Sequence, residues 1–460
     1  MDRCAALTSA LNTARTLITG GYVLTMDPAL GELLSADILI ENESIRAVGQ
    51  TIDAPDADVI DASSMIVMPG FVDTHRHTWQ TAVRHCYADV DPLQYFAEML
   101  GPVGAAYRPE DVRIGTLLGA LSALDAGITT LVDWSHCMNT PDHADAAVDA
   151  LTESSIRAVF AHGWPLAPEW TRDSALPHPA DLRRLRESRF SAPDQLLTLA
   201  MAARGPEMAR SEVWLGDLRL ARDLGIRSTV HVGAYAHNAR HRAVAQLRDA
   251  GVLGPDLTFV HCSRSAADEI AMIADAGASI SLGVHCELNS AGMGDIPLDR
   301  ILAAGLRPSL SGDTETKCSG DMFTQMRLLL GYYRSWTGGG HSRVPDPPFL
   351  GVRDVLEFAT LAGARAAGLD SQTGSLSPGK RADLILLRAT DLNLAPVTDP
   401  AAAVVLAAHP GNVDTVLVGG RTVKRHGRLL ATGLPAVLEL AEHSRRRVLA
   451  TIATQRTATA

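Results

Sequence analysis

The sequence predicts an α/β fold, a (β/α)8 TIM barrel that carries a small β-sandwich domain built from both termini. Three observations support this prediction. Eight apolar, strand-like runs alternate with helix-like runs through the middle of the chain. Several helix-like runs end in glycine, as a helix C-cap does. Both ends of the chain are rich in short strand-like segments and turns. Regular β/α alternation over roughly 300 residues is typical of a parallel barrel.

The strand-like runs are short and apolar, and each is followed by polar or helix-like sequence. They cover residues 64–73, 128–134, 155–163, 196–203, 227–232, 257–262, 278–283 and 307–313. Clear helix-like runs between them cover residues 109–127 and 237–251. A doubly wound open sheet is the alternative, and the absence of a G-x-G-x-x-G pattern after the first strand disfavours it.

The two β-rich ends define the domain organisation. Residues 1–65 and 374–432 are predicted to form the two parts of the β-sandwich, and residues 66–373 the barrel. The tail, residues 433–460, has the pattern of an exposed amphipathic helix.

Composition restricts the classes of partner. A net charge of -11 and a pI near 5.8 argue against a nucleic-acid or anionic-membrane surface. No window of 18 residues is apolar and uncharged, so no transmembrane helix is expected. The six cysteines are scattered without a C-x-x-C motif, and the N-terminus lacks a convincing signal peptide. These features predict a reduced, cytoplasmic protein that acts on a small molecule.

The segment GFVDTHRHTWQ, residues 70–80, places His75 and His77 directly after the first predicted strand. Side chains two residues apart on a strand point to the same side. Two imidazoles on one side are half of a metal site. A lone His-x-His is more often an accident of surface or core, so the rest of the coordination shell decides the interpretation.

Other ligand-type residues end other predicted barrel strands. His231 lies near the end of the fifth strand, His261 ends the sixth, and Asp313 ends the eighth. Because catalytic groups of a parallel barrel gather at the carboxyl ends of its strands, these side chains are expected to meet. Three imidazoles and one carboxylate, from His75, His77, His231 and Asp313, give a zinc shell with an open position for water. His261 is expected to contact that water or the substrate.

Several motifs resemble the amidohydrolase superfamily, and the resemblance covers nearly the whole chain. PGFVDTHRHTWQ resembles its first-strand motif. GSLSPGKRADLILL and NVDTVLVGGRTVKRHG resemble β-sandwich segments of the cytosine deaminase and triazine hydrolase branch, and TTLVDWSHCMNTPDHADAAV resembles a further stretch found in that branch. The resemblance implies that His75, His77, His231 and Asp313 bind metal. It also implies that Asp313 handles the proton of the water, that His261 orients the water or polarises the scissile group, and that the protein is a homodimer or higher homo-oligomer.

The lysine count bears on the number of metals. Binuclear members of the superfamily bridge two metals with a carboxylated lysine from the fourth strand. The chain has lysine only at Lys317, Lys380 and Lys424, so the fourth strand has none. We therefore expect one divalent metal ion, Zn²⁺ in the first place and Fe²⁺ as the alternative.

One departure from the branch concerns the proton donor. Typical deaminases of this branch carry a glutamate three residues after the fifth-strand histidine, and Ala234 stands at that position. Glu287, after the seventh strand, is the predicted replacement as a catalytic carboxylate, with an exposed loop glutamate as the other interpretation. Glu315 is a weaker candidate.

Polar and aromatic residues near the predicted strand ends are candidates for substrate binding. Each has an equally ordinary structural interpretation as a packing or hydrogen-bonding residue of the core. The candidates are Trp79, Gln80, His136, His162 and His285.

The predicted function is that of a mononuclear metal-dependent hydrolase. The metal lowers the pKa of water from about 15.7 toward 7, and the hydroxide attacks a C–N bond of a small, cyclic, heterocyclic substrate in deaminase-like chemistry. The missing glutamate keeps alternatives open: hydrolysis of an amide or opening of a ring, or lyase or isomerase chemistry on the same centre. A metal-free binding protein is the third class.

Overall fold

The computed structural model describes residues 15–171, 173–192, 194–431 and 433–459. One of its two sheets is parallel, and the eight strands of this sheet follow one another in chain order. Residues 1–14, which belong to the predicted N-terminal β segment, lie outside the described residues. The strands of this sheet are β6 (Phe71–Arg76), β7 (Ile128–Ser135), β8 (Arg157–His162), β9 (Leu197–Ala203), β10 (Arg227–Val232), β11 (Leu257–His261), β12 (Ser279–Leu282) and β13 (Ser309–Leu310).

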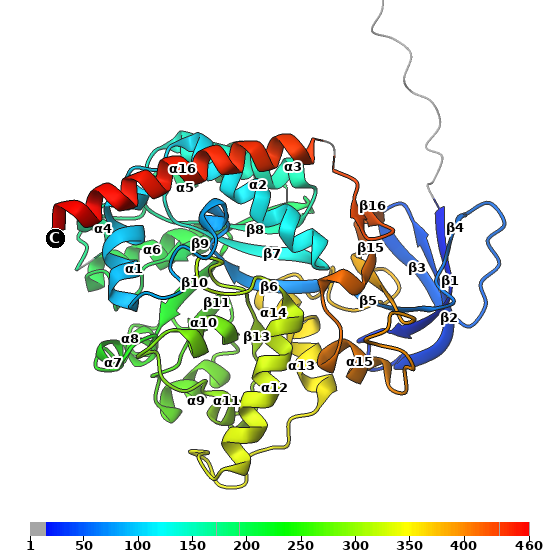
Figure 1. The fold of residues 1–460 in the computed structure, drawn as a ribbon. Helices are drawn as coiled ribbons and strands as arrows, with labels where there is room; N and C mark the ends of the chain where they lie inside the picture. Colours follow the sequence, from blue (N-terminus) through cyan, green and yellow to red (C-terminus); the bar gives the residue numbers. More distant parts are fainter. Residues whose placement is uncertain (1–14, 172, 193, 432, 460) are drawn as a thin grey trace, which may run out of the picture.

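The sheet closes between its first and last strands. The backbone N–H of His77 donates to the carbonyl of Asp313 at 2.8 Å, and the N–H of Asp313 donates to the carbonyl of His75 at 2.9 Å. A parallel bridge between Arg76 and Asp313 completes the contact. The barrel fold predicted from the sequence is therefore confirmed (Figure 1).

Helices surround the barrel strands and connect them (Figure 1). The α-helices are α1 (Pro92–Glu98), α2 (Pro109–Asp125), α3 (Pro141–Ser154), α4 (Pro168–Thr171), α5 (Asp181–Ser188), α6 (Ser211–Asp223), α7 (Ala236–Ala239), α8 (Ala243–Asp249), α9 (Ala267–Asp275), α10 (Val284–Asn289), α11 (Leu298–Ala303), α12 (Met322–Gly338), α13 (Val352–Phe358), α14 (Leu361–Ala366), α15 (Pro400–Leu406) and α16 (Leu434–Thr459). Three short helices of other types are η1 (Thr78–Val83), η2 (Met99–Val103) and η3 (Pro410–Asn412).

A second, mixed sheet combines strands from both ends of the chain. Its order is β17-β16-β15-β14-β5-β1-β2-β3, with β4 pairing β1, and the antiparallel pair β5–β14 joins the two halves. The predicted small β domain from both termini is confirmed, and its exact boundaries stay a prediction. The strands are β1 (Arg15–Leu24), β2 (Glu32–Glu41), β3 (Ser44–Gly49), β4 (Asp58–Asp61), β5 (Met65–Pro69), β14 (Leu384–Arg388), β15 (Val413–Val418), β16 (Arg421–Arg425) and β17 (Arg428–Leu429).

The run 64–73, predicted as one barrel strand, contains two strands of different sheets. Strand β5 pairs in the mixed sheet, and β6 begins the barrel. Gly70 lies between them, and a Cβ at this position would lie 2.1 Å from Oγ1 of Thr129. Because glycine has no Cβ, the backbone at residue 70 can lie this close to the side chain of Thr129. The chain passes from the mixed sheet to the barrel at this residue.

The run 237–251, predicted as one helix, is also divided. It forms α7 and α8, separated by Arg242 in the left-handed region at φ 50°. Arg242 is the N-cap of α8, and a left-handed residue cannot lie inside a right-handed helix, so a single helix cannot run through this position.

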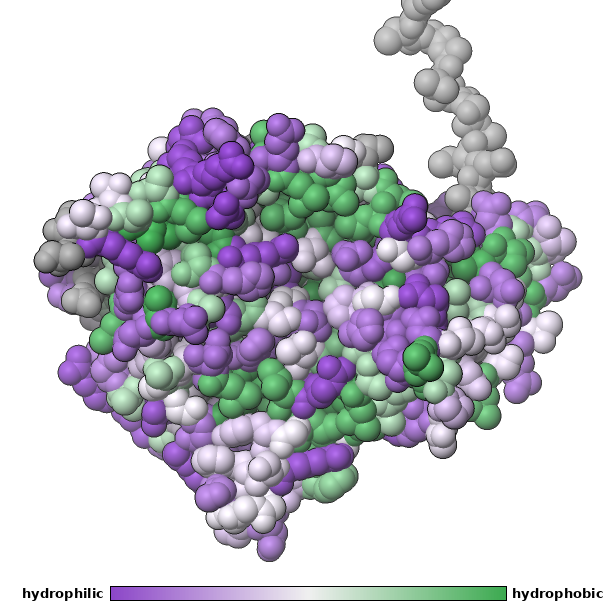
Figure 2. Space-filling model, viewed as in Figure 1, coloured by the Kyte–Doolittle hydropathy of each residue, from purple (hydrophilic) through white to green (hydrophobic). Residues whose placement is uncertain are grey.

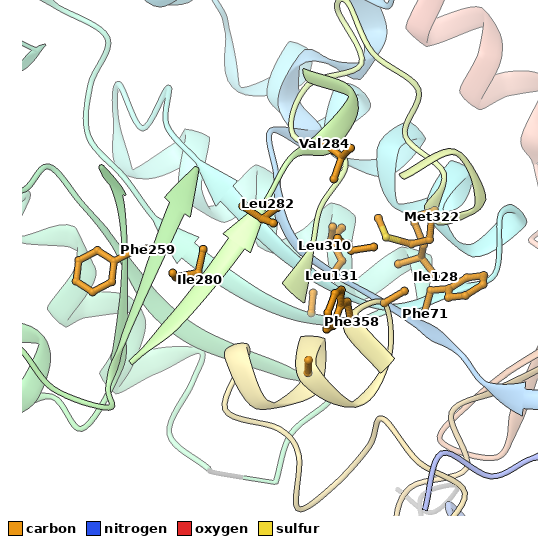
Figure 3. Close-up of a cluster of buried hydrophobic side chains, with 14 of the residues drawn as sticks. Phe71, Ile128, Leu131, Phe259, Ile280, Leu282, Val284, Leu310, Met322 and Phe358 are labelled. Carbon is orange, nitrogen blue, oxygen red and sulfur yellow. The ribbon is translucent and has the colours of Figure 1, made fainter. Parts of the chain in front are cut away.

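The barrel strands pack apolar side chains against the surrounding helices. Figure 3 shows part of this core, with Leu282 of β12 and Leu310 of β13 on neighbouring strands and Phe71 beside the α12 residue Met322. The ring of Phe71 meets Phe323 of α12 edge to face, at a centroid separation of 5.0 Å. This packing fixes the start of β6, the strand that carries the His-x-His motif.

The C-terminal helix α16 lies across the outside of the barrel, over α2 (Figure 1). Its Ser444 hydroxyl donates to Asp111 of α2 at 2.8 Å, and Arg447 pairs with the same carboxylate. Hydrophilic residues are distributed over the face shown in Figure 2 among smaller hydrophobic areas.

Among the described residues, no helix is both long enough and apolar enough to span a membrane. The cysteines of the described residues are free thiols: Cys86, Cys137, Cys262, Cys286 and Cys318.

Candidate metal centre

Four predicted ligands converge at the carboxyl end of the barrel. His75 lies on β6, His77 follows that strand, His231 lies on β10 and Asp313 follows β13. Nε2 of His75 lies 3.2 Å from Nε2 of His231 and 3.6 Å from Oδ1 of Asp313. Nε2 of His77 lies 3.4 Å from the same carboxylate oxygen.

These separations fit a tetrahedral metal. Ligand atoms about 2.0–2.1 Å from a tetrahedral zinc ion are about 3.3 Å from one another. The three measured separations, 3.2, 3.4 and 3.6 Å, lie close to that value. In these three pairs the donor atoms have the chemistry and the spacing of metal ligands. Two overlapping groups, His75 with His77 and His231, and His75 with His261 and Asp313, could each hold a metal ion.

The protonation state of the imidazoles agrees with metal binding. Burial lowers the pKa of His77 to about 3, and burial also lowers the pKa of His75 and of His231. The imidazoles are thus neutral at physiological pH, as metal ligands must be. Nδ1 of His77 lies 3.0 Å from the carbonyl oxygen of Trp134, which accepts the ring proton and leaves Nε2 free to bind.

The carboxylate of Asp313 stays ionised although it is buried. Burial alone raises its pKa, but the contacts with His75, His261 and His77 outweigh this effect and hold the pKa well below 3.8. The backbone of Asp313 is in the left-handed region at φ 54°. A non-glycine residue is strained there, and such positions concentrate at functional sites.

His261 lies beside the four predicted ligands and is held by contacts of its own. Its Nε2 lies 3.9 Å from Oδ2 of Asp313, and its Nδ1 donates to Oε1 of Glu287 at 3.1 Å. The same Oε1 accepts the backbone N–H of Gly283 at 2.9 Å. Burial opposes protonation of His261, but Glu287 and Asp313 outweigh it and raise the pKa of the imidazole. His261 can therefore donate a proton from Nε2 toward the centre.

The structure gives Glu287 a different position from the one predicted. The sequence placed its carboxylate at the mouth, where it could replace the missing glutamate. The side chain is instead buried under His261 and bound to that imidazole and to Gly283. In this position Glu287 orients the imidazole of His261 and raises its pKa.

Trp79, Gln80 and His136 lie around the predicted ligands. Trp79 Nε1 donates to Nδ1 of His136 at 3.2 Å, and the His136 ring stacks on His77 at a centroid separation of 4.4 Å. The amide of Gln80 donates to Tyr95, and its oxygen accepts the hydroxyl of Thr314 at 2.7 Å. These three predicted residues are buried against the centre.

The other two predicted substrate-binding residues have other partners. Nδ1 of His162 lies 3.0 Å from Nε2 of His178, and Nε2 of His162 lies 3.6 Å from Asp181. His285 accepts the backbone N–H of Ser319 at 3.0 Å. His162 thus belongs to a separate buried cluster, and His285 joins the segments that follow β12 and β13.

Some residues of the site were not identified from the sequence. The ring of Trp134, at the end of β7, packs against His231 at a centroid separation of 4.1 Å. Tyr95, Tyr235 and Lys317 border the centre from loops and short helices. Glu315, the weaker candidate, forms an ion pair with Arg84 at 3.2 Å. The bordering residues gave no sequence signal because no periodic pattern places them.

Comparison with known proteins agrees with this geometry. A sequence model of the amidohydrolase family matches residues 66–423, and the chain belongs to that family. It is a hydrolase of carbon–nitrogen bonds other than peptide bonds. The resemblance stated from the sequence is thereby confirmed.

Relatives and solved structures cover nearly the whole chain. A 5'-deoxyadenosine deaminase of Methanosarcina acetivorans is 26% identical over 95% of this chain and 99% of its own length. A 5-methylthioadenosine/S-adenosylhomocysteine deaminase of Symbiobacterium thermophilum is 29% identical over 89% of this chain and 93% of its own.

Two zinc-containing crystal structures share the fold. The adenosine deaminase of Xanthomonas campestris has a TM-score of 0.84 at 23% identity and covers 95% of this chain and 99% of its own. The atrazine chlorohydrolase of Arthrobacter aurescens has a TM-score of 0.81 at 21% identity and covers 94% and 100%.

Proposed function

We propose that the protein is a mononuclear metal-dependent deaminase of a small heterocyclic substrate. The observation that carries the proposal is the close approach of the donor atoms. Those of His75, His77 and His231 lie within 4.8 Å of one another. Oδ1 of Asp313 lies 3.6 Å from Nε2 of His75 and 3.4 Å from Nε2 of His77. Zn²⁺ suits three imidazoles and a carboxylate, and Fe²⁺ is the alternative. The absence of lysine from β9 supports one metal instead of a lysine-bridged pair.

A divalent ion at this site would lower the pKa of water from about 15.7 toward 7 and so make a nucleophile available at neutral pH. Asp313, held ionised by its histidine neighbours, accepts the proton of the attacking water. His261 faces the same space and donates a hydrogen bond to the group under attack, while Glu287 holds its tautomer. Asp313 then returns the proton to the departing amine.

Deamination is favoured over the other reactions by the relatives, since the two described above are deaminases of adenosine-type compounds. An amino group on an aromatic ring carbon is the corresponding bond for this chain. Amide hydrolysis, ring opening and lyase or isomerase chemistry have no comparable support, and family membership favours an enzyme over a metal-free binding protein. Assembly as a homodimer stays a prediction from the family.

Metal analysis combined with an ammonia-release assay tests the proposal. The purified protein should contain about one equivalent of metal and release ammonia from an aminated purine or pyrimidine. His75→Ala should lose both the metal and the turnover. A protein that neither contains nor takes up metal, or a His75→Ala variant that keeps full activity, would refute the assigned centre.

A further inference from the structure

Lys317 is an incompletely neutralised cation close to the metal centre. It lies four residues after Asp313. Its Nζ donates to the hydroxyl of Ser290 at 2.8 Å and lies 5.1 Å from the ring centroid of Tyr95. Within the part of the chain that the structure describes, the ammonium forms no ion pair with a carboxylate. A half-buried cation with one neutral hydrogen-bond partner retains most of its capacity to bind an anion.

The other two lysines of the chain are used differently. Lys424 forms an ion pair with Asp125 at 2.9 Å, far along the chain in the β domain. Lys380 donates to the backbone carbonyl of Thr373. Lys317 is therefore the lysine that the fold places beside the reaction centre with its charge still available.

The surroundings of Lys317 come from four segments at the carboxyl end of the barrel. Tyr95 lies on α1, Tyr235 follows β10, Ser290 follows α10, and Lys317 follows β13. After burial, the charge of Asp313 contributes to the raised pKa of both Tyr95 and Tyr235, so both phenols lie near that carboxylate. The Tyr235 hydroxyl also interacts with Ser290, the residue that accepts from Lys317.

The segment that carries Lys317 is held in place by its backbone. The carbonyl of Lys317 accepts from Asn289 Nδ2 at 2.9 Å. The N–H of Ser319 donates to His285, and its carbonyl accepts from Gln325 Nε2 at 3.0 Å. A cation fixed in this way binds a ligand without first losing the freedom of its loop.

We propose that Lys317, together with the hydroxyls of Ser290 and Tyr235, binds an anionic oxygen of the substrate. The substrate is then an aminated heterocycle that carries a carboxylate or a comparable oxyanion. The inference rests on the proposed deamination and adds the charge of the substrate. The ammonium supplies the positive charge, and the two hydroxyls donate to the remaining lone pairs of the oxyanion.

Binding of matched charged and neutral compounds tests the proposal. Two pairs are titrated into zinc-loaded protein by calorimetry: adenosine-5'-carboxylate with its carboxamide, and cytosine-5-carboxylate with its carboxamide. In at least one pair, the carboxylate should bind tenfold or more tightly than the amide. Lys317→Met should bring that ratio to about one with zinc content unchanged, and Lys317→Arg should retain the preference.

Three outcomes overturn the proposal. The first is the absence of a charge preference in both pairs, through equal binding or through none. The second is a preference that survives Lys317→Met, which would place the carboxylate on the metal. The third is a loss of the carboxylate preference in Lys317→Arg as complete as in Lys317→Met. That result would mean that the positive charge is not what binds the carboxylate, and it would assign Lys317 a packing role. Ammonia release is measured separately, so a charge preference without ammonia would refute deamination and leave the anion subsite standing.

Discussion

The half-buried carboxyl of Glu207 gives a stability prediction with a definite sign. Glu207 follows β9, and its Oε1 accepts the backbone N–H of Gly233 at 2.8 Å. Burial raises the pKa of Glu207 from 4.5 to about 8, against the opposing effect of the Gly233 bond, and Glu269 adds to the increase. In the unfolded chain the carboxyl regains its usual pKa, so folding at neutral pH requires uptake of a proton.

The pKa difference sets the size of the effect. An acid whose pKa is raised by folding stabilises the folded state fully below its unfolded pKa and loses that contribution as the pH rises toward the folded pKa. Between the two pKa values, the free energy of unfolding falls by about 1.4 kcal/mol per pH unit. At pH 7 the ionisable carboxyl therefore lowers the free energy of unfolding by about 3 kcal/mol. Glu207→Gln keeps a carbonyl oxygen for Gly233 and has no proton to take up. The variant should therefore be more stable than the parent protein by about 3 kcal/mol at pH 7.

Urea unfolding at pH 5, 6, 7 and 8 measures this difference. The advantage of Glu207→Gln should grow from about 1 kcal/mol at pH 5 to about 4 kcal/mol at pH 8. Glu110→Gln is the control for the substitution itself, because Glu110 is exposed on the surface. A difference that does not change with pH, or a Glu207→Gln variant less stable than the parent at pH 7, would contradict the reasoning.

Three further perturbations test other contacts. Glu287→Gln removes the negative charge that orients His261, so kcat should fall about 10–100-fold with metal content unchanged; wild-type rates in a steady-state assay would contradict this role. Arg157→Met breaks the buried pair with Asp383, whose shortest N–O separation is 2.6 Å, and should cost about 3–5 kcal/mol in chemical unfolding. An Arg157→Met variant as stable as the parent protein, within experimental error, would contradict a stabilising role for this ion pair. Removal of the metal with a chelator should abolish turnover and lower the Tm, and one equivalent of Zn²⁺ should restore both; an unchanged Tm would count against a site that stabilises the fold.

The meeting of the four predicted ligands could be anticipated from the sequence because the barrel imposes their geometry. His75, His77, His231 and Asp313 each lie at or near the carboxyl end of a strand, and parallel strands bring those ends to one edge. Strand alternation also predicts that His75 and His77 share a side. The fold therefore converts four distant positions into one cluster without detailed knowledge of the loops.

Positions controlled by neighbouring helices could not be predicted in this way. His162 also ends a strand, but His178 and Asp181, from the segment before α5 and from α5 itself, give it separate partners. Glu287 turns inward because α10 begins at Val284, which places its carboxylate next to His261 and the N–H of Gly283. No strand period encodes either arrangement, so both depend on tertiary packing.

Ala234 and Lys317 change the electrostatics of the pocket in the same direction. The branch that the sequence resembles carries a glutamate where this chain has Ala234, so a negative charge is absent next to Tyr235. Lys317 adds a positive charge whose hydrogen-bond partner, Ser290, also contacts Tyr235. A carboxylate at position 234 would weaken the positive potential around Lys317, and of the two charges this chain has the cation. The missing carboxylate and the available ammonium are thus both explained if the negative charge belongs to the substrate.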